Sequence, residues 1–162
     1  MDGSGVAIGA QNIYHEASGA FTGEMSAEMA KSVGCTHVLV GHSERRELFG
    51  ETDEMTNLKT RKIIDSGMTA VLCIGETKDE YEAGQAKSVC ARQLAAGLAG
   101  VEADEMTRVI IAYEPVWAIG TGLTATPAIA QSVHAGIRDW FGQNYGESVA
   151  SKIRIQYGGS VK

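Results

Sequence analysis

Five short apolar runs recur along the 162-residue chain, and they constrain its fold more than any other feature. Each run is rich in Val, Ile or Leu and shows little polar alternation, which is typical of strands buried on both faces of a parallel sheet. The runs lie at residues 6–11, 37–41, 69–74, 108–113 and 153–157. We therefore expect about five parallel strands.

Helical segments with recognisable start signals separate these runs. Ser26 and Thr126 stand where N-caps are expected, and Pro127 follows Thr126 at the first helical position. Thr77 and Glu80 have the spacing of a capping box. These signals predict four connecting helices, over residues 26–34, 52–67, 77–100 and 126–142.

The regular alternation of strand and helix predicts a single α/β domain over residues 1–162. A closed eight-stranded (β/α)8 barrel takes ~250 residues, or ~31 for each strand–helix unit, so this chain holds about five units. We therefore expect either a five-stranded open sheet or part of a barrel that does not close.

The charge pattern limits the classes of partner. The 14 Lys and Arg residues against 20 Asp and Glu residues give a formal net charge of −6 without a visible basic patch, so we expect no nucleic-acid binding. No apolar stretch approaches the ~18 residues of a membrane span. The three cysteines form no CxxC pair, which favours a reduced, cytoplasmic protein. The four histidines lack metal-ligand spacing, so we expect no metal.

In parallel α/β folds the active site lies at the carboxyl ends of the strands, so the residues after each run are the candidates. His42 opens "HSERR" at an expected helix start, where a neutral imidazole could donate a hydrogen bond to an oxyanion. Glu114 follows the fourth run in an apolar context, where a raised pKa would suit a general base. The alternatives are a capping or packing histidine and a structural acid paired with Lys or Arg.

Two glycine-containing segments also follow strands. In residues 115–122, Pro115 and Trp117 stiffen a segment that Gly120 and Gly122 could hinge, which predicts a lid. The overlapping "GTGLTA" matches a dinucleotide-binding fingerprint, but its glycines do not follow the strand directly and we reject that function. The "YGGSV" after the last run could cradle a phosphate with backbone N–H groups and the Ser160 hydroxyl, or could be a plain tight turn.

Together the motifs "GAQN", "GAFTGE", "GHSERR", "VLCIGE", "AYEPVWAIGTG" and "QYGGSV" resemble the triosephosphate isomerases, in that order and with familiar separations. The resemblance spans nearly the whole chain and looks strongest to bacterial members. It implies a partial (β/α)8 barrel, from the third to the seventh strand. It also implies an isomerase of glycolysis and gluconeogenesis that interconverts dihydroxyacetone phosphate and D-glyceraldehyde 3-phosphate without a cofactor.

The resemblance also implies roles for individual residues. Glu114 would be the base that moves a proton between C1 and C2, and His42 the electrophile that polarises the carbonyl. Ser43 and Glu44 would be active-site neighbours, and the Gly120 N–H and Ser160 would bind the substrate phosphate. The implied lid is Pro115, Val116, Trp117, Ala118, Ile119, Gly120, Thr121 and Gly122.

A homodimer is the implied assembly. The "GAFTGE" loop around Thr22 would enter the partner subunit, with Glu24 and Arg45 near the interface. The first, second and eighth strands of the barrel, with an asparagine, a lysine and a glycine pair of the site, have no counterpart here. We therefore expect exposed sheet edges and weak or absent activity of this chain alone. The alternatives are a non-catalytic, self-associating phosphate-binding remnant and a different phosphate-binding barrel enzyme.

Overall fold

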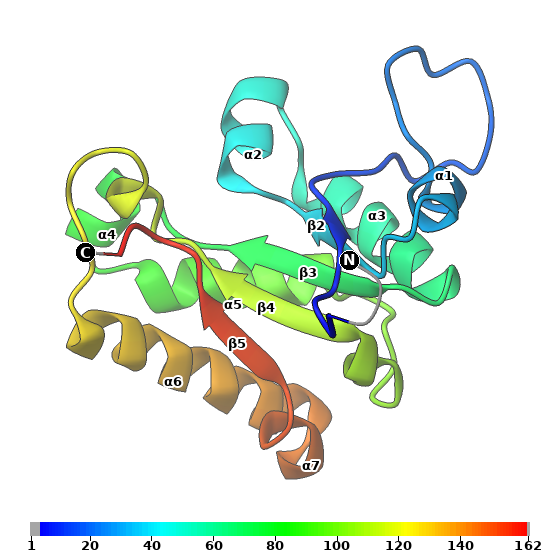
Figure 1. Ribbon diagram of the computed structural model, residues 1–162. Coiled ribbons are helices and arrows are strands. Elements are labelled where there is room, and N and C mark those ends of the chain that lie inside the picture. The colour runs from blue at the N-terminus through cyan, green and yellow to red at the C-terminus, as the bar shows by residue number, and fades with distance from the viewer. Residues whose placement is uncertain (1–3, 162) are drawn as a thin grey trace.

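The computed structural model describes residues 4–161, which form one parallel sheet with strand order β1-β2-β3-β4-β5 (Figure 1). Each strand pairs in parallel with the next one along the chain. The strands are β1 (Gly9–Ala10), β2 (His37–Val40), β3 (Thr69–Ile74), β4 (Val109–Tyr113) and β5 (Arg154–Tyr157). Among the described residues β1 and β5 do not pair with each other, which confirms a partial barrel that does not close.

The four expected connections each carry a main helix. These are α1 (Ala27–Ser32), α3 (Asp53–Asp65), α5 (Ala86–Gly97) and α6 (Pro127–Tyr145). Short elements accompany them: α2 (Ser43–Phe49), α4 (Lys78–Glu82), α7 (Glu147–Ala150), and the 3-10 turns η1 (Glu105–Arg108) and η2 (Val116–Ala118).

The segment expected as one helix over residues 77–100 is two helices, α4 and α5. The break falls at Gly84, whose φ of 71° lies outside the range of a right-handed helix. The capping signals themselves are confirmed. The hydroxyls of Ser26 and Thr126 accept the N–H groups of Met29 and Ile129, and Thr77 forms the predicted capping box with Glu80.

The first strand is shorter than the apolar run that predicted it. Only Gly9 and Ala10 pair with β2, opposite His37 and Val38, whereas residues 6–11 were expected. Val6 lies beyond the paired residues and is 64% exposed. In the structure β1 is an edge strand that pairs with β2 alone. The residues of the run before Gly9 therefore lie outside the paired part of the sheet.

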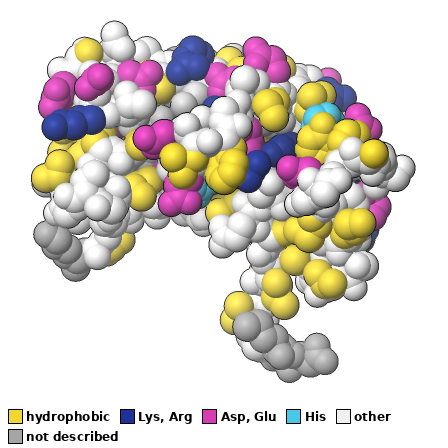
Figure 2. All heavy atoms as spheres, turned by 90° about the horizontal axis from the view of Figure 1, so that it is seen from above, with side chains coloured by type: hydrophobic (Ala, Val, Ile, Leu, Met, Phe, Trp, Pro, Cys, Tyr) yellow, Lys and Arg dark blue, Asp and Glu magenta, His cyan; other side chains and the backbone are white. Residues whose placement is uncertain are grey.

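The sheet is curved, and its two faces differ. Its convex face is covered by helices, with a core that includes Leu72, Ile111 and Phe141, each fully buried. A smaller cluster lies on the other face and consists of Val71, Cys73, Ile110 and Ala112, with Leu39 packed against it. Figure 2 shows that the body bends around a hollow on one side. The carboxyl ends of all five strands meet at one rim of this curved sheet, where the candidate site lies.

Candidate active site

His42 and Glu114 lie side by side at the carboxyl rim of the sheet. His42 follows β2 after Gly41, and Glu114 follows β4 directly. The His42 Nε2 atom is 3.5 Å from Glu114 Oε1, and the Ser43 N–H donates a 3.2 Å hydrogen bond to Glu114 Oε2. The expected neighbours His42, Ser43 and Glu114 therefore form one cluster.

The backbone at the start of α2 selects the tautomer of the neutral His42 ring. Its Nδ1 atom accepts the N–H of Glu44 at 3.2 Å, so this nitrogen carries no proton. In the neutral ring the proton is then on Nε2, the nitrogen that faces Glu114. His42 is also the N-cap of α2. His42 can therefore both cap α2 and donate a hydrogen bond to an oxyanion.

Glu114 is a buried carboxylate with a raised pKa. Its side chain is 8% exposed, and desolvation is the largest cause of the shift. His42, the Ser43 N–H, the Cys73 thiol and Arg46 all act in the opposite direction and lower the pKa, in that order of size. Burial prevails, and a carboxylate of raised pKa is a stronger base than one in water.

Two glycines allow the backbone to crowd around Glu114. A Cβ atom on Gly75 would lie 1.8 Å from the Glu114 carbonyl oxygen, and one on Gly158 would lie 2.9 Å from Glu114 Cγ. Neither position can hold a side chain without displacing the base. The first glycine of "YGGSV" therefore has a packing reason that the sequence motif did not reveal.

The segment predicted as a lid, residues 115–122, is anchored at its amino-terminal half. The buried Glu76 accepts hydrogen bonds at Oε1 from Trp117 Nε1 (2.8 Å) and from the Tyr113 hydroxyl (3.0 Å). Trp117 also stacks on Tyr81, with ring centroids 4.3 Å apart. Beyond Trp117 the chain turns outward through Gly120 and Gly122, at φ 68° and 79°, and becomes exposed. Closure of this segment stays a prediction.

The two expected phosphate donors flank this outer half. The Ser160 N–H is 3.1 Å from the Ala118 carbonyl oxygen and donates to it, which joins the turn after β5 to the predicted lid. The Gly120 N–H has no hydrogen-bond partner in the described part of the chain. It is therefore available to an anion, whereas the Ser160 N–H is engaged in this conformation.

The residues expected at a dimer interface do not join this cluster. Thr22 and Glu24 are exposed in the long loop between β1 and α1, which projects from the body (Figure 1). Within that loop Phe21 packs on Tyr14, with ring centroids 4.5 Å apart. Arg45 instead donates to Glu51 Oε2 at 2.8 Å and lies over the Phe49 ring.

Sequence reasoning missed three residues that support the site. Cys73 was expected in the core; it is buried, and it also lines a small cavity together with Glu114 and lowers the pKa of that carboxyl. Glu76 anchors the predicted lid, and it follows β3 after Gly75 as His42 follows β2 after Gly41, so the rule that selected His42 would have found it. Arg46 donates to the Gly41 and Cys73 carbonyls from α2, which no sequence signal indicated.

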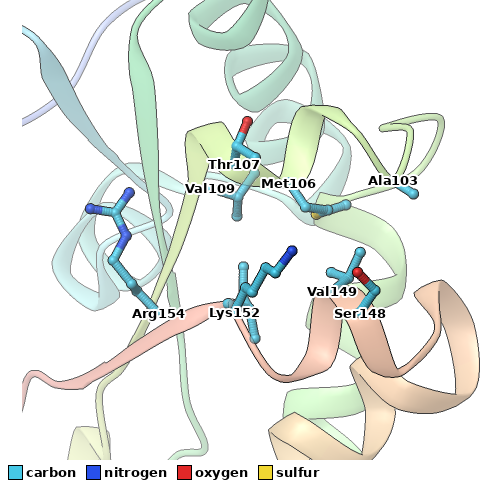
Figure 3. A pocket seen from close by; sticks show the side chains of 9 residues that line it. Ala103, Met106, Thr107, Val109, Ser148, Val149, Lys152 and Arg154 are labelled. Atoms are coloured by element: carbon cyan, nitrogen blue, oxygen red, sulfur yellow. The ribbon is translucent and has the colours of Figure 1, made fainter.

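Two hollows lie at opposite ends of the sheet. The larger, about 1100 Å³, opens beside the cluster and is lined by Ser43, Trp117 and the outer part of the predicted lid. The other, about 330 Å³, lies at the amino ends of β4 and β5 (Figure 3). There Lys152 extends between Val109 and Val149. Val109 begins β4, whereas Glu114 follows the other end of that strand. We place the candidate site at the acid–base pair itself, which the first hollow adjoins through Ser43, although neither His42 nor Glu114 lines that hollow.

The described residues include no group of three or more His, Cys, Asp or Glu side chains placed to hold a metal ion. In the same part of the chain, no helix is long and apolar enough to cross a membrane. Cys35, Cys73 and Cys90 are all free thiols.

The curved parallel sheet, with a buried carboxylate facing an imidazole at its carboxyl rim, defines a protein of the (β/α)8-barrel class. Comparison with known proteins gives the family. The family model described as triosephosphate isomerase matches residues 1–162. The chain belongs to the triosephosphate isomerase family.

Individual relatives agree with this assignment. The chain is 54% identical over 162 residues to the triosephosphate isomerase of Chlorobium luteolum and 51% identical over 162 residues to that of Herpetosiphon aurantiacus. It is 52% identical over 159 residues to that of Chloroflexus aurantiacus. These matches cover 98–100% of this chain but only 64–65% of each relative. The chain thus spans about 64% of the length of the curated relatives it matches.

Proposed function

We propose that this chain carries the base, the electrophile and the lid of a triosephosphate isomerase. The reaction is the interconversion of dihydroxyacetone phosphate and D-glyceraldehyde 3-phosphate through an enediolate, as in glycolysis and gluconeogenesis. Residues 1–162 form one incomplete barrel domain in this proposal. The pairing of a carboxylate base with a neutral histidine is the one for which the family is known.

The protons move between two side chains and the substrate. The Glu114 carboxylate removes a proton from the C1 carbon of dihydroxyacetone phosphate, and the electron pair moves toward the carbonyl oxygen at C2. The His42 Nε2–H donates a hydrogen bond to that oxygen and stabilises its developing charge. His42 then passes its Nε2 proton to the C2 oxygen and recovers one from the C1 hydroxyl, and Glu114 returns its proton to C2, so that C1 becomes the aldehyde. No redox partner or cofactor enters this balance.

One observation carries the proposal: His42 Nδ1 accepts the Glu44 N–H while Nε2 faces Glu114 at 3.5 Å. This arrangement leaves one proton on the imidazole, directed to the space where the base acts. A histidine that only capped α2 would not need to face a buried carboxylate. The raised pKa of Glu114 supports the role of that carboxylate as a base.

Substrate phosphate would bind near the outer half of the lid. The exposed, unpartnered Gly120 N–H supports this placement. The Ser160 N–H would have to exchange its bond to Ala118 for one to phosphate, which suits a segment that moves on binding. Ser43 and Glu44 contribute to the site through their backbone N–H groups.

A coupled isomerase assay on this chain tests the proposal. The lysine and the glycine pair that the family resemblance implies for the site have no counterpart in these 162 residues. Loss of such charge stabilisation costs several kcal/mol, at about 1.36 kcal/mol for each tenfold in rate. We therefore expect turnover orders of magnitude below that of a complete enzyme, and no turnover in Glu114→Gln. Turnover that Glu114→Gln leaves unchanged would contradict the proposal.

We also propose that the chain forms a homodimer in the cytoplasm, through the loop around Thr22. The exposed Phe21 in that loop and the exposed Leu48 and Phe49 at the end of α2 support an interface of this kind. Light scattering after size exclusion should show a dimer, and a stable, soluble monomer would contradict it. The alternative of a non-catalytic, self-associating phosphate-binding remnant predicts an oligomer that binds phosphate without any turnover dependent on Glu114.

A further inference from the structure

The Arg46 guanidinium joins the ends of two neighbouring strands. From α2, its Nε donates to the Gly41 carbonyl at 2.8 Å and its Nη2 donates to the Cys73 carbonyl at 3.4 Å. Gly41 immediately precedes His42, and Cys73 lines a small cavity together with Glu114. One side chain thus holds the backbone next to both members of the acid–base pair.

The close approach of Arg46 to the strand end depends on Gly41. A Cβ atom at that position would lie 2.8 Å from Arg46 Nη2, and the residue has a φ of 70°. Gly41 is therefore suited both to the turn and to the guanidinium that lies against it. The position favours an arginine over a lysine, because the planar guanidinium can donate hydrogen bonds to several acceptors at once.

Asp53, the first residue of α3, fixes the orientation of Arg46. Its Oδ1 accepts from Arg46 Nη1 at 2.6 Å, and its Oδ2 accepts from Arg92 Nη1 on α5 at 2.8 Å. The Arg46 and Asp53 side chains are largely buried, whereas Arg92 is 59% exposed. The shorter, shielded bond to Arg46 is the one expected to matter more, because solvent weakens the other.

Arg46 and Glu114 also face the same space. A small cavity of about 20 Å³ is lined by Gly41, Arg46, Cys73 and Glu114, among others. The charged or titratable side chains that act on the carboxylate are His42 from the start of α2, Arg46 from within α2 and Cys73 from β3. Arg46 and Glu114 therefore line one small cavity, and the charge of Arg46 lowers the pKa of the carboxyl.

We propose that Asp53 and Arg46 form a positioning pair that ties β2 to β3 at the rim and sets both the place and the basicity of Glu114. Asp53 acts through Arg46, and neither residue touches the reacting atoms. The pair ties the two strand ends, and the partial neutralisation of Arg46 by Asp53 controls how strongly the guanidinium favours an ionised Glu114. A role of this pair in catalysis rests on the proposed function, but its effect on the position and basicity of Glu114 does not.

The test measures two properties of the free protein. Carboxyl carbon NMR, with Glu114→Gln to assign the signal, gives the Glu114 titration. Amide hydrogen exchange of Ser43, whose N–H is bonded to Glu114, reports whether β2 and β4 stay in place. Neither readout needs substrate, so failure of this inference and absence of isomerase activity are separate results.

Four variants separate charge from geometry. Arg46→Gln should raise the Glu114 pKa and speed Ser43 exchange roughly tenfold. Arg46→Lys should return the pKa toward that of the unsubstituted protein but leave exchange fast, because an ammonium does not reproduce the planar set of bonds. Asp53→Asn should lower the Glu114 pKa, because Arg46 stays on the strand carbonyls without its counter-charge.

Arg92→Gln is the matched control. It removes the other cation bonded to Asp53 but touches neither strand carbonyl, so both readouts should stay at the values of the unsubstituted protein. A folded Arg46→Gln protein with unchanged titration and unchanged Ser43 exchange would overturn the inference. If Arg46→Gln does not fold, the inference is tested by Asp53→Asn alone. A Glu114 pKa that does not fall in Asp53→Asn would then overturn the inference.

Discussion

The Nε2 atom of His42 lies 3.5 Å from Oε1 of Glu114, while the Nδ1 atom of the same ring accepts the Glu44 N–H. The ring is therefore held by the backbone on one side and offers a single proton on the other. This geometry assigns different tasks to the two residues: the buried carboxylate can accept a proton, and the neutral imidazole can donate a hydrogen bond.

Replacement of His42 by Asn should remove the hydrogen-bond donor with little cost to the fold. Asn is a good N-cap, so α2 should still start at Ser43. We expect the rate of isomerisation to fall by about a hundredfold or more, down to the background of the buffer. The same substitution at His37, at the amino end of β2, is the control. Equal rates for both variants would contradict the role of His42.

The pKa of Glu114 predicts an unusual dependence of stability on pH. Because the folded-state pKa is raised above the ordinary value of 4.5, the unfolded chain releases this proton first as pH rises. Glu114 therefore destabilises the fold above that value, as pH rises through the folded-state pKa. Glu114→Gln should unfold at higher denaturant concentration than the unsubstituted protein at pH 7, and the difference should vanish in acid.

The exposed Glu82 on α4 provides the control for that comparison. Glu82→Gln makes the same chemical change at the surface and should leave the denaturation midpoint nearly unchanged at both pH values. Our interpretation fails if Glu114→Gln is less stable than the unsubstituted protein by a similar amount at every pH.

Glu51 should behave in the opposite way. Burial raises its pKa, but hydrogen bonds from Lys59 and Arg45 outweigh burial and lower it overall. The stability it contributes is present above the ordinary value and is lost as pH falls through the folded-state pKa. Glu51→Gln leaves Lys59, itself buried, without its anion, and should cost about 3 kcal/mol near neutral pH.

Chemical denaturation across a pH series checks this prediction. Glu28→Gln breaks a pair with Lys62 that lies at the surface, and it should cost less than about 1 kcal/mol. A cost for Glu51→Gln as small as that of Glu28→Gln would show that the buried pair does not stabilise the fold as described.

The anchor of the predicted lid can be tested with a double-mutant cycle. Trp117→Phe keeps an aromatic ring against Tyr81 but removes the Nε1–H that Glu76 accepts. We expect this substitution and Glu76→Gln to be coupled by about 1 kcal/mol in the free energy of unfolding. The control cycle combines Glu76→Gln with Trp140→Phe, because the Trp140 side chain makes no hydrogen bond to Glu76. Equal coupling energies in the two cycles would contradict the anchor.

Much of the fold could be predicted because local signals and global pattern agree. The unbroken apolar runs predict parallel strands, and Ser26, Thr77 and Thr126 form the caps that their spacing predicts. Helix limits were less predictable. The break at Gly84 depends on a positive φ, which a glycine permits but does not require.

Some residues of the candidate site could also be predicted from the sequence, and others could not. His42 and Glu114 could be found because each follows a strand, and topology brings strand ends to one rim. Cys73 and Arg46 could not be found like this. Their importance depends on which atoms they reach across β2, β3 and β4, and a residue list contains no such distances. Glu76 is an intermediate case, because its position after β3 was visible but its partner Trp117 was not.

The central claim is that Glu114 and His42 form a proton-transfer site for a triose phosphate. Its most direct measurement is exchange of the C1 hydrogens of dihydroxyacetone phosphate with deuterium from the solvent, followed by proton NMR in the presence of this chain. We predict slow exchange above the buffer rate, kept in Glu82→Gln and lost in Glu114→Gln. Exchange at the same rate with the unsubstituted chain and with Glu114→Gln would contradict the claim.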